Sequence, residues 1–117
     1  MSGTVSWMLT LSVNEGKLDK FRELMEEMVA ATREESGTLM YEWFLSEDDA
    51  CHLYERYADD GATMVHLGNF GAKFAGRFLG CVTPTGFSVY GTPGAEVRQA
   101  LGAFGPNYLA PFGGFAR

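Results

Sequence analysis

The chain has 117 residues, a net charge of −6 and a pI near 4.8, and 46% of its residues are hydrophobic and 14% aromatic. This length fits one domain with a sizeable core. The nine basic residues are scattered singly, which argues against binding to nucleic acid or to an anionic membrane. The two cysteines, Cys51 and Cys81, follow no metal-ligand spacing and are predicted to be reduced thiols.

The first element predicted is a β-strand at residues 4–13, where apolar side chains alternate with mostly small hydroxylated ones. The apolar positions are Val5, Trp7, Leu9, Leu11 and Val13. The segment lacks a basic start, and Ser and Thr interrupt its apolar run, so we expect neither a signal peptide nor a membrane span. These expectations favour a cytoplasmic protein.

A long amphipathic helix is predicted for residues 17–36. Apolar side chains and one threonine recur there with helical spacing, at Leu18, Phe21, Leu24, Met25, Met28, Val29 and Thr32. Gly37 is expected to end this helix in the left-handed C′ conformation.

Two further strands are predicted at residues 38–46 and 51–58. The short acidic turn between them favours an antiparallel hairpin. Both strands carry large apolar side chains at odd and at even positions. A strand of this kind must be covered on both faces.

A second helix is predicted directly after this hairpin. Asp59 and Asp60 are expected to cap it, so the helix begins at about Asp60. His66 is the leading titratable candidate of the chain, and it shares one helical stripe with three neighbours, Ala62, Val65 and Asn69.

Aromatic side chains dominate the rest of the chain. Phenylalanines extend or restart the second helix by recurring every fourth residue, at Phe70, Phe74 and Phe78. A fourth strand is predicted at residues 85–91, followed by a short helix at residues 95–104. Residues 105–117 are aromatic and rich in Gly and Pro, and we expect them to form an extended arm across another surface.

The order β-α-β-β-α-β predicts an α+β ferredoxin-like fold with a four-stranded antiparallel sheet. Residues 1–91 would form this domain, and residues 92–117 would add a helix and an aromatic arm that packs on the domain or on a dimer partner. Two helices cover only one face of such a sheet, and a monomer tolerates roughly a few hundred Å² of exposed apolar surface. We therefore expect a homodimer whose sheets face each other as a barrel and enclose the substrate. A monomer whose own tail covers the sheet is the alternative.

Three segments resemble a known family. They are Gly16-Lys17 at the start of the first helix, SGTLMYEWF at residues 36–44, and YERYADDGATMVH at residues 54–66. Together they are similar to the antibiotic biosynthesis monooxygenase-like proteins, dimeric α+β barrels that include cofactor-independent quinol and polyketide monooxygenases. The similarity runs over about residues 5–89. One position departs from it, because the family often has a second histidine where this chain has Phe70.

The resemblance implies that the chain oxygenates a small aromatic phenol or quinol with O2, without a metal or another cofactor. Deprotonation of such a substrate creates an anion that can give an electron to O2, and His66 is the predicted catalytic base. The predicted substrate-binding residues are aromatic, since flat apolar rings suit an aromatic guest: Trp7, Trp43, Tyr54, Tyr57 and Phe70.

Other interpretations stay open at this point. His66 is also compatible with an ordinary buried core histidine, and the protein with a non-catalytic barrel that binds a small apolar metabolite. Haem handling is a third possibility. Glu55 is expected to form an ion pair with Arg22 or Arg33 on the first helix. A metal site is not expected, because His52 and Glu55 would point to opposite faces of a strand.

Overall fold

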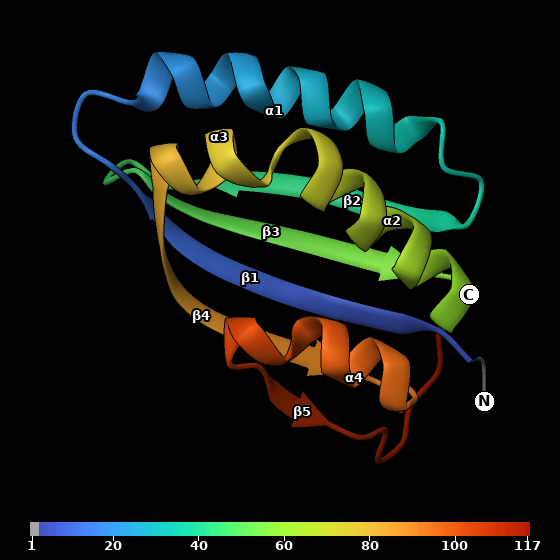
Figure 1. Ribbon diagram of the computed structural model, residues 1–117. Coiled ribbons are helices and arrows are strands. Elements are labelled where there is room, and N and C mark those ends of the chain that lie inside the picture. The colour runs from blue at the N-terminus through green and yellow to red at the C-terminus, as the bar shows by residue number, and fades with distance from the viewer. Residues whose placement is uncertain (1–2) are drawn as a thin grey trace.

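The computed structural model of the chain describes residues 3–117 (Figure 1). The first two residues of the predicted first domain lie outside this range. Its elements, in chain order, are β1 (Val5–Val13), α1 (Leu18–Arg33), β2 (Thr38–Leu45), β3 (Ala50–Tyr57), α2 (Asp60–Lys73), α3 (Ala75–Cys81), β4 (Val82–Tyr90), α4 (Ala95–Leu101), the 3-10 turn η1 (Gly102–Phe104) and β5 (Asn107–Leu109).

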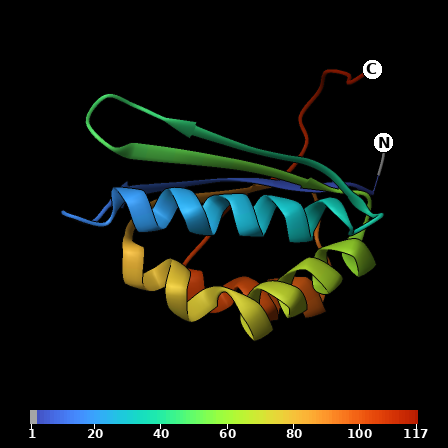
Figure 2. The same ribbon diagram turned by 90° about the horizontal axis from the view of Figure 1, so that it is seen from above.

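The strands form one sheet in the order β2-β3-β1-β4-β5. All neighbouring strands are antiparallel except β4 and β5, which are parallel. The four α-helices lie on one face of this sheet, and the other face carries no helix (Figure 2). The predicted α+β ferredoxin-like fold is confirmed. The fifth strand was not predicted, because three residues are too few to show an alternating pattern.

The core lies between the sheet and the helices in two clusters. One cluster joins β1, β3 and β4 to α1 and α3, and includes Leu11, Phe21 and Phe78. The other joins the same sheet to α4, and includes Trp7, Val97 and Leu101. The helix predicted after the fourth strand is therefore part of the core of its own chain. The division of the sequence at residues 91 and 92 stays a prediction.

The end of α1 differs from the prediction. The helix stops at Arg33, and Gly37 is not among the glycines with positive φ. Gly37 is needed for a different reason, because a Cβ atom at this position would lie 2.5 Å from Cβ of Ala62 on α2. The absence of a side chain thus lets the loop before β2 approach α2 closely. Glu34 and Glu35 lie in this loop instead of in the helix.

The start of α2 is capped by Asp59 alone, whose Oδ1 accepts a hydrogen bond from the amide of Ala62 at 2.8 Å. Asp60 does not cap the helix as predicted. Its Oδ2 accepts a hydrogen bond from the amide of Gly94 at 2.9 Å, which fixes the segment before α4. Val65 is 56% exposed, so its predicted place beside His66 on the packed stripe is wrong.

The helical segment after His66 restarts instead of continuing. Phe74 takes a non-helical conformation between α2 and α3, in the stretch where glycines weaken the helical pattern. The following strand, β4, begins at Val82, three residues earlier than predicted. Its first residues include Pro84, and the pairing of β1 with β4 shifts register next to this point, between Thr10 and Leu11. The start of β4 was not predicted at Val82, because Pro84 interrupts the strand pattern of the sequence.

The face of the sheet without helices, called the open face below, is of mixed character. Strand alternation places Met8, Tyr54 and Arg56 on it, since their neighbours Trp7, Leu53 and Glu55 are buried on the helix side. Met40 and Phe44 of β2 are 38% and 53% exposed. The C-terminal tail leaves the molecule on this side (Figure 2). Within residues 3–117, no helix has the length and apolar character needed to cross a membrane.

Candidate active site

An apolar cavity of about 60 Å³ lies between the sheet and the helices. Every strand from β1 to β4 and every helix contributes to its lining. The lining residues are Trp7, Leu9, Met28, Tyr41, Leu53, Glu55, His66, Leu67, Phe70, Phe78, Leu79, Pro84, Phe87, Leu101 and Phe104. Leu79 and Phe104 are 48% and 45% exposed, so the cavity meets solvent between α3 and η1.

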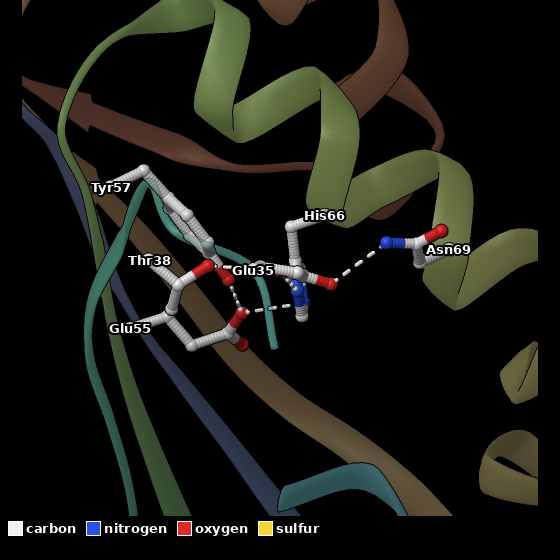
Figure 3. Close-up of polar contacts among 6 residues, drawn as sticks. All are labelled: Glu35, Thr38, Glu55, Tyr57, His66 and Asn69. Atoms are coloured by element: carbon white, nitrogen blue, oxygen red, sulfur yellow. Dashed lines mark hydrogen bonds and ion pairs between the residues drawn. The ribbon is translucent and has the colours of Figure 1, made fainter. Parts of the chain in front are cut away.

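His66 projects from α2 to the polar end of this cavity and is held between two carboxylates (Figure 3). Its Nδ1 lies 2.9 Å from Oε1 of Glu35, in the loop after α1. Its Nε2 lies 3.1 Å from Oε1 of Glu55 on β3. All three side chains are at least nine-tenths buried. Three segments that are distant in sequence therefore meet at one imidazole.

Further polar side chains donate hydrogen bonds to the two carboxylates. Thr38 donates its hydroxyl to Oε1 of Glu35 at 2.8 Å, and Asn69 donates its amide to Oε2 of Glu35 at 3.0 Å. Tyr57 donates its hydroxyl to Oε1 of Glu55. Figure 3 shows these groups arranged around the imidazole. Buried carboxylates persist when donors of this kind compensate for lost hydration.

The neighbouring charges decide the protonation of His66. Burial alone would lower its pKa, but the hydrogen bonds and negative charges of Glu55 and Glu35 outweigh burial and raise the pKa of His66 above 6.5. Burial and the negative charge of Glu55 raise the pKa values of the Tyr57 and Tyr41 phenols far above their usual range. Both phenols thus remain protonated, and the raised pKa of His66 favours its imidazolium form.

Aromatic rings fix the orientation of the imidazole. The ring of Tyr57 lies 5.0 Å from that of His66 at 35°, and the ring of Tyr41 lies 5.5 Å away at 63°. Thr63, one turn before His66, is fully buried and donates its hydroxyl to the carbonyl of Asp59 at 2.8 Å. The capped first turn of α2 and the packed rings leave the imidazole little freedom to rotate.

The predicted site residues fall into two groups. His66, Trp7 and Phe70 line the cavity. Tyr57 is fully buried beside the imidazole and contacts Trp7, but it is not a lining residue. Trp43 packs against Phe21 and Phe78 in the core, and Tyr54 lies on the open face by strand alternation, so neither lines this cavity.

Sequence reasoning missed the two glutamates. Glu55 was expected to pair with Arg22 or Arg33, and this is wrong, because its carboxylate pairs with His66 and Tyr57. A signal was present: Glu55 shares strand parity with the apolar residues Leu53 and Tyr57, so it had to be buried. Glu35 had no such signal, because it lies in the loop where the helix was expected to continue.

The substrate is predicted to lie between two sheets, on the face without helices, and this stays a prediction. The cavity beside His66 lies on the other face, between the sheet and the helices. Among residues 3–117, no group of three or more His, Cys, Asp or Glu side chains is arranged to hold a metal ion.

Comparison with known proteins identifies the family. The family model described as antibiotic biosynthesis monooxygenase matches residues 4–73, which is more than half of the chain. The chain belongs to the antibiotic biosynthesis monooxygenase family. The resemblance found in the sequence is thus confirmed, and Glu35, Glu55 and His66 all lie within the matched part of this family member.

Solved structures share the fold at low sequence identity. The crystal structure of MupZ from Pseudomonas fluorescens is 21% identical, with a TM-score of 0.87 over 100% of this chain and 91% of MupZ. SnoaB, a cofactor-independent oxygenase from Streptomyces nogalater, is 13% identical, with a TM-score of 0.66 over 80% of this chain and 97% of SnoaB. At these identities the likeness shows the fold alone. No protein among the curated ones matches this family member.

Proposed function

We propose that this family member is a cofactor-independent monooxygenase that oxidises a small aromatic phenol or quinol with O2. The observation that carries this proposal is the apolar, largely aromatic cavity whose lining holds one carboxylate, Glu55, and one imidazole, His66. An apolar wall suits an aromatic guest, and the adjacent ionisable pair can accept its proton. The family and the cofactor-independent oxygenase SnoaB support the same chemistry.

The reaction needs no group beyond substrate, O2 and a proton acceptor. Loss of the phenolic proton leaves an electron-rich anion, which transfers one electron to O2. The resulting radical and superoxide combine at a ring carbon that bears hydrogen, and the peroxide then loses water. One oxygen atom enters the ring as a carbonyl and the other leaves in water. Exclusion of solvent by the apolar lining protects the charged intermediates.

The size of the cavity sets a condition on binding. Its volume of about 60 Å³ is smaller than the ~150 Å³ of an engineered cavity that holds benzene. A ring therefore enters only if side chains at the mouth move. Leu79 and Phe104 are the candidates, because they line the cavity and are about half exposed.

We also propose that the protein is a homodimer formed through the open face. Phe112 and Phe115 in the tail are 106% and 83% exposed, so these two rings do not pack against their own sheet. A groove of about 1010 Å³ separates the tail from open-face residues such as Met40 and Tyr90. A second copy would bury these apolar groups. We expect sedimentation at micromolar concentration to show two copies, and Phe44→Glu to favour one copy; a wild-type monomer would contradict the dimer.

The test of the function is O2 uptake with one- and two-ring hydroquinones. We expect wild-type protein to consume O2 and to incorporate one atom of ¹⁸O2 into the product. His66→Ala should reduce the rate by about 10²-fold or more, since one acid or base group contributes an effect of that size. Val65→Ala is a matched control on the same helix, because Val65 points to solvent. Equal rates in wild type and His66→Ala would remove His66 from the reaction.

The alternative is a binding protein with the same fold. The feature that favours it is Phe70, which lines the cavity at the position where the family often has a second histidine. Saturable binding of hydroquinones without O2 uptake by wild-type protein would select this alternative.

A further inference from the structure

The hydrogen-bond geometry around His66 sets the number of protons in the site. Both ring nitrogens lie within 3.1 Å of a carboxylate oxygen. Where both glutamates are ionised, their oxygens can only accept hydrogen bonds, and the form of the imidazole that fits between them carries a proton on each ring nitrogen. In this form the imidazole is a cation that lies between two carboxylates, Glu35 and Glu55. Neither nitrogen has a free lone pair with which to take a proton from a substrate.

The two carboxylates differ in what remains free. Both oxygens of Glu35 have partners: Oε1 lies 2.9 Å from Nδ1 of His66 and accepts from Thr38, and Oε2 accepts from Asn69. It is also not among the lining residues of the cavity. Glu35 thus holds the imidazole in place and keeps it charged without meeting the substrate.

Glu55 has one oxygen to spare. Its Oε1 accepts from Tyr57 and lies 3.1 Å from Nε2 of His66, whereas Oε2 takes no hydrogen bond within the described part of the chain. Glu55 lines the cavity and its side chain is only 5% exposed. A carboxylate oxygen at an apolar wall is the acceptor that an incoming O–H or acidic C–H group would meet.

We propose that Oε2 of Glu55 is the proton acceptor of the site, and that His66 is a fixed cation that stabilises the substrate anion. This assignment rests on the proposed function and deepens it. The substrate X–H bond breaks, its electron pair stays on the substrate, and the proton forms a new O–H bond on Glu55. The cluster of Glu35, His66 and Glu55 changes from a net charge of −1 to zero, and the negative charge passes to the substrate beside the imidazolium. Glu35 is a positioning residue.

The resting protonation is tested without substrate by ¹⁵N NMR of the imidazoles. The chain has two histidines, and the exposed His52 is an internal reference. We expect both nitrogens of His66 to be protonated at pH 7. Glu35→Gln should lower the pKa of His66, because it removes one of the two neighbouring negative charges. A neutral His66 tautomer at pH 7 in the wild type would overturn the assignment.

Proton transfer is tested separately from oxygenation by using a carbon acid under argon. The probe is 2-tetralone in D2O, and the measurement is the rate at which its C1 protons exchange with solvent. We expect Glu55→Gln to slow the protein-catalysed exchange by about 10²-fold or more. Equal exchange in wild type and Glu55→Gln, zero included, would overturn the role of Glu55. Catalysed exchange without O2 uptake would instead reject the monooxygenase while the proton acceptor stands.

The pH profile of this exchange separates Glu55 from His66 as the base. If His66 must be charged, the rate falls at alkaline pH as His66 loses its proton, and Glu35→Gln moves this fall to lower pH. If neutral His66 were the base, the rate would rise with pH through the same ionisation, and Glu35→Gln would move this rise to lower pH. A gain in rate at neutral pH in Glu35→Gln would therefore contradict the proposal.

Discussion

The two faces of the sheet use the same strands for different purposes. On β3, Leu53, Glu55 and Tyr57 are buried against the helices, whereas Tyr54 and Arg56, on the opposite parity, face the side without helices. On the helix side the glutamate is a buried partner of His66, and on the open face charged groups meet solvent. An ionisable residue on the apolar parity of a strand is therefore the one to examine for chemistry. Such a residue loses its hydration and is retained only with partners.

The buried polar network around His66 lies on the helix side, where it joins Glu35 and Glu55. Trp43 Nε1, also on this side, is the one fully enclosed side-chain nitrogen or oxygen of residues 3–117 without a hydrogen-bond partner. On the open face, large apolar groups such as Phe44 are partly exposed. We therefore expect stability and the proposed chemistry to depend mainly on the helix side, and the proposed association of two copies to depend on the open face.

The largest expected effect on stability comes from Trp7→Ala. Trp7 is 3% exposed and contacts Tyr57 and Phe87, so its truncation should lower the free energy of unfolding by about 3–5 kcal/mol. This loss should be the same at every protein concentration. Phe44→Ala, on the open face, should lower stability only where copies associate. Guanidinium unfolding at two protein concentrations measures both, and a concentration-independent loss in Phe44→Ala would contradict the comparison.

An intermediate effect is expected at the contact between the loop before β2 and α2. Gly37→Ala should destabilise the protein by about 1–3 kcal/mol, because the new methyl group meets the Cβ of Ala62. Ala62→Gly removes this clash but by itself costs about 1 kcal/mol, because glycine is unfavourable in a helix. The double variant should therefore be more stable than the sum of the two single effects predicts. If the effects of Gly37→Ala and Ala62→Gly on thermal unfolding simply add, the contact with Ala62 is not the reason that position 37 requires glycine.

The smallest expected effect is the pH dependence of stability. The pKa of His66 is raised in the folded protein, so its stabilising contribution is complete below the unfolded pKa of about 6.5 and is lost as pH rises through the folded pKa. The difference in unfolding free energy between wild type and His66→Gln should therefore shrink as the pH increases above neutrality. Urea unfolding over a pH series measures this difference. A difference that grows with pH would contradict the raised pKa of His66 in the folded protein.

Patterns in the sequence predicted the fold and the family, but only part of the site. Strict alternation marked β1, and the acidic residue Asp59 marked the start of α2. His66 was found because helical spacing identifies a face. Glu35 was not predicted, since its position depends on where α1 ends, and the helical pattern continues past that point to residue 36. The three-residue β5 was not predicted from the sequence, because its pairing with β4 does not depend on the local pattern of the chain.

The most direct test of the account uses the methionines of the two faces. Met28 lines the cavity on the helix side, whereas Met8 and Met40 lie on the open face. We expect a titration of [¹³C-methyl]methionine-labelled protein with hydroquinone under argon to shift the Met28 signal and to leave those of Met8 and Met40 in place. Shifts at Met8 and Met40 with an unchanged Met28 would place the guest on the open face and contradict the account.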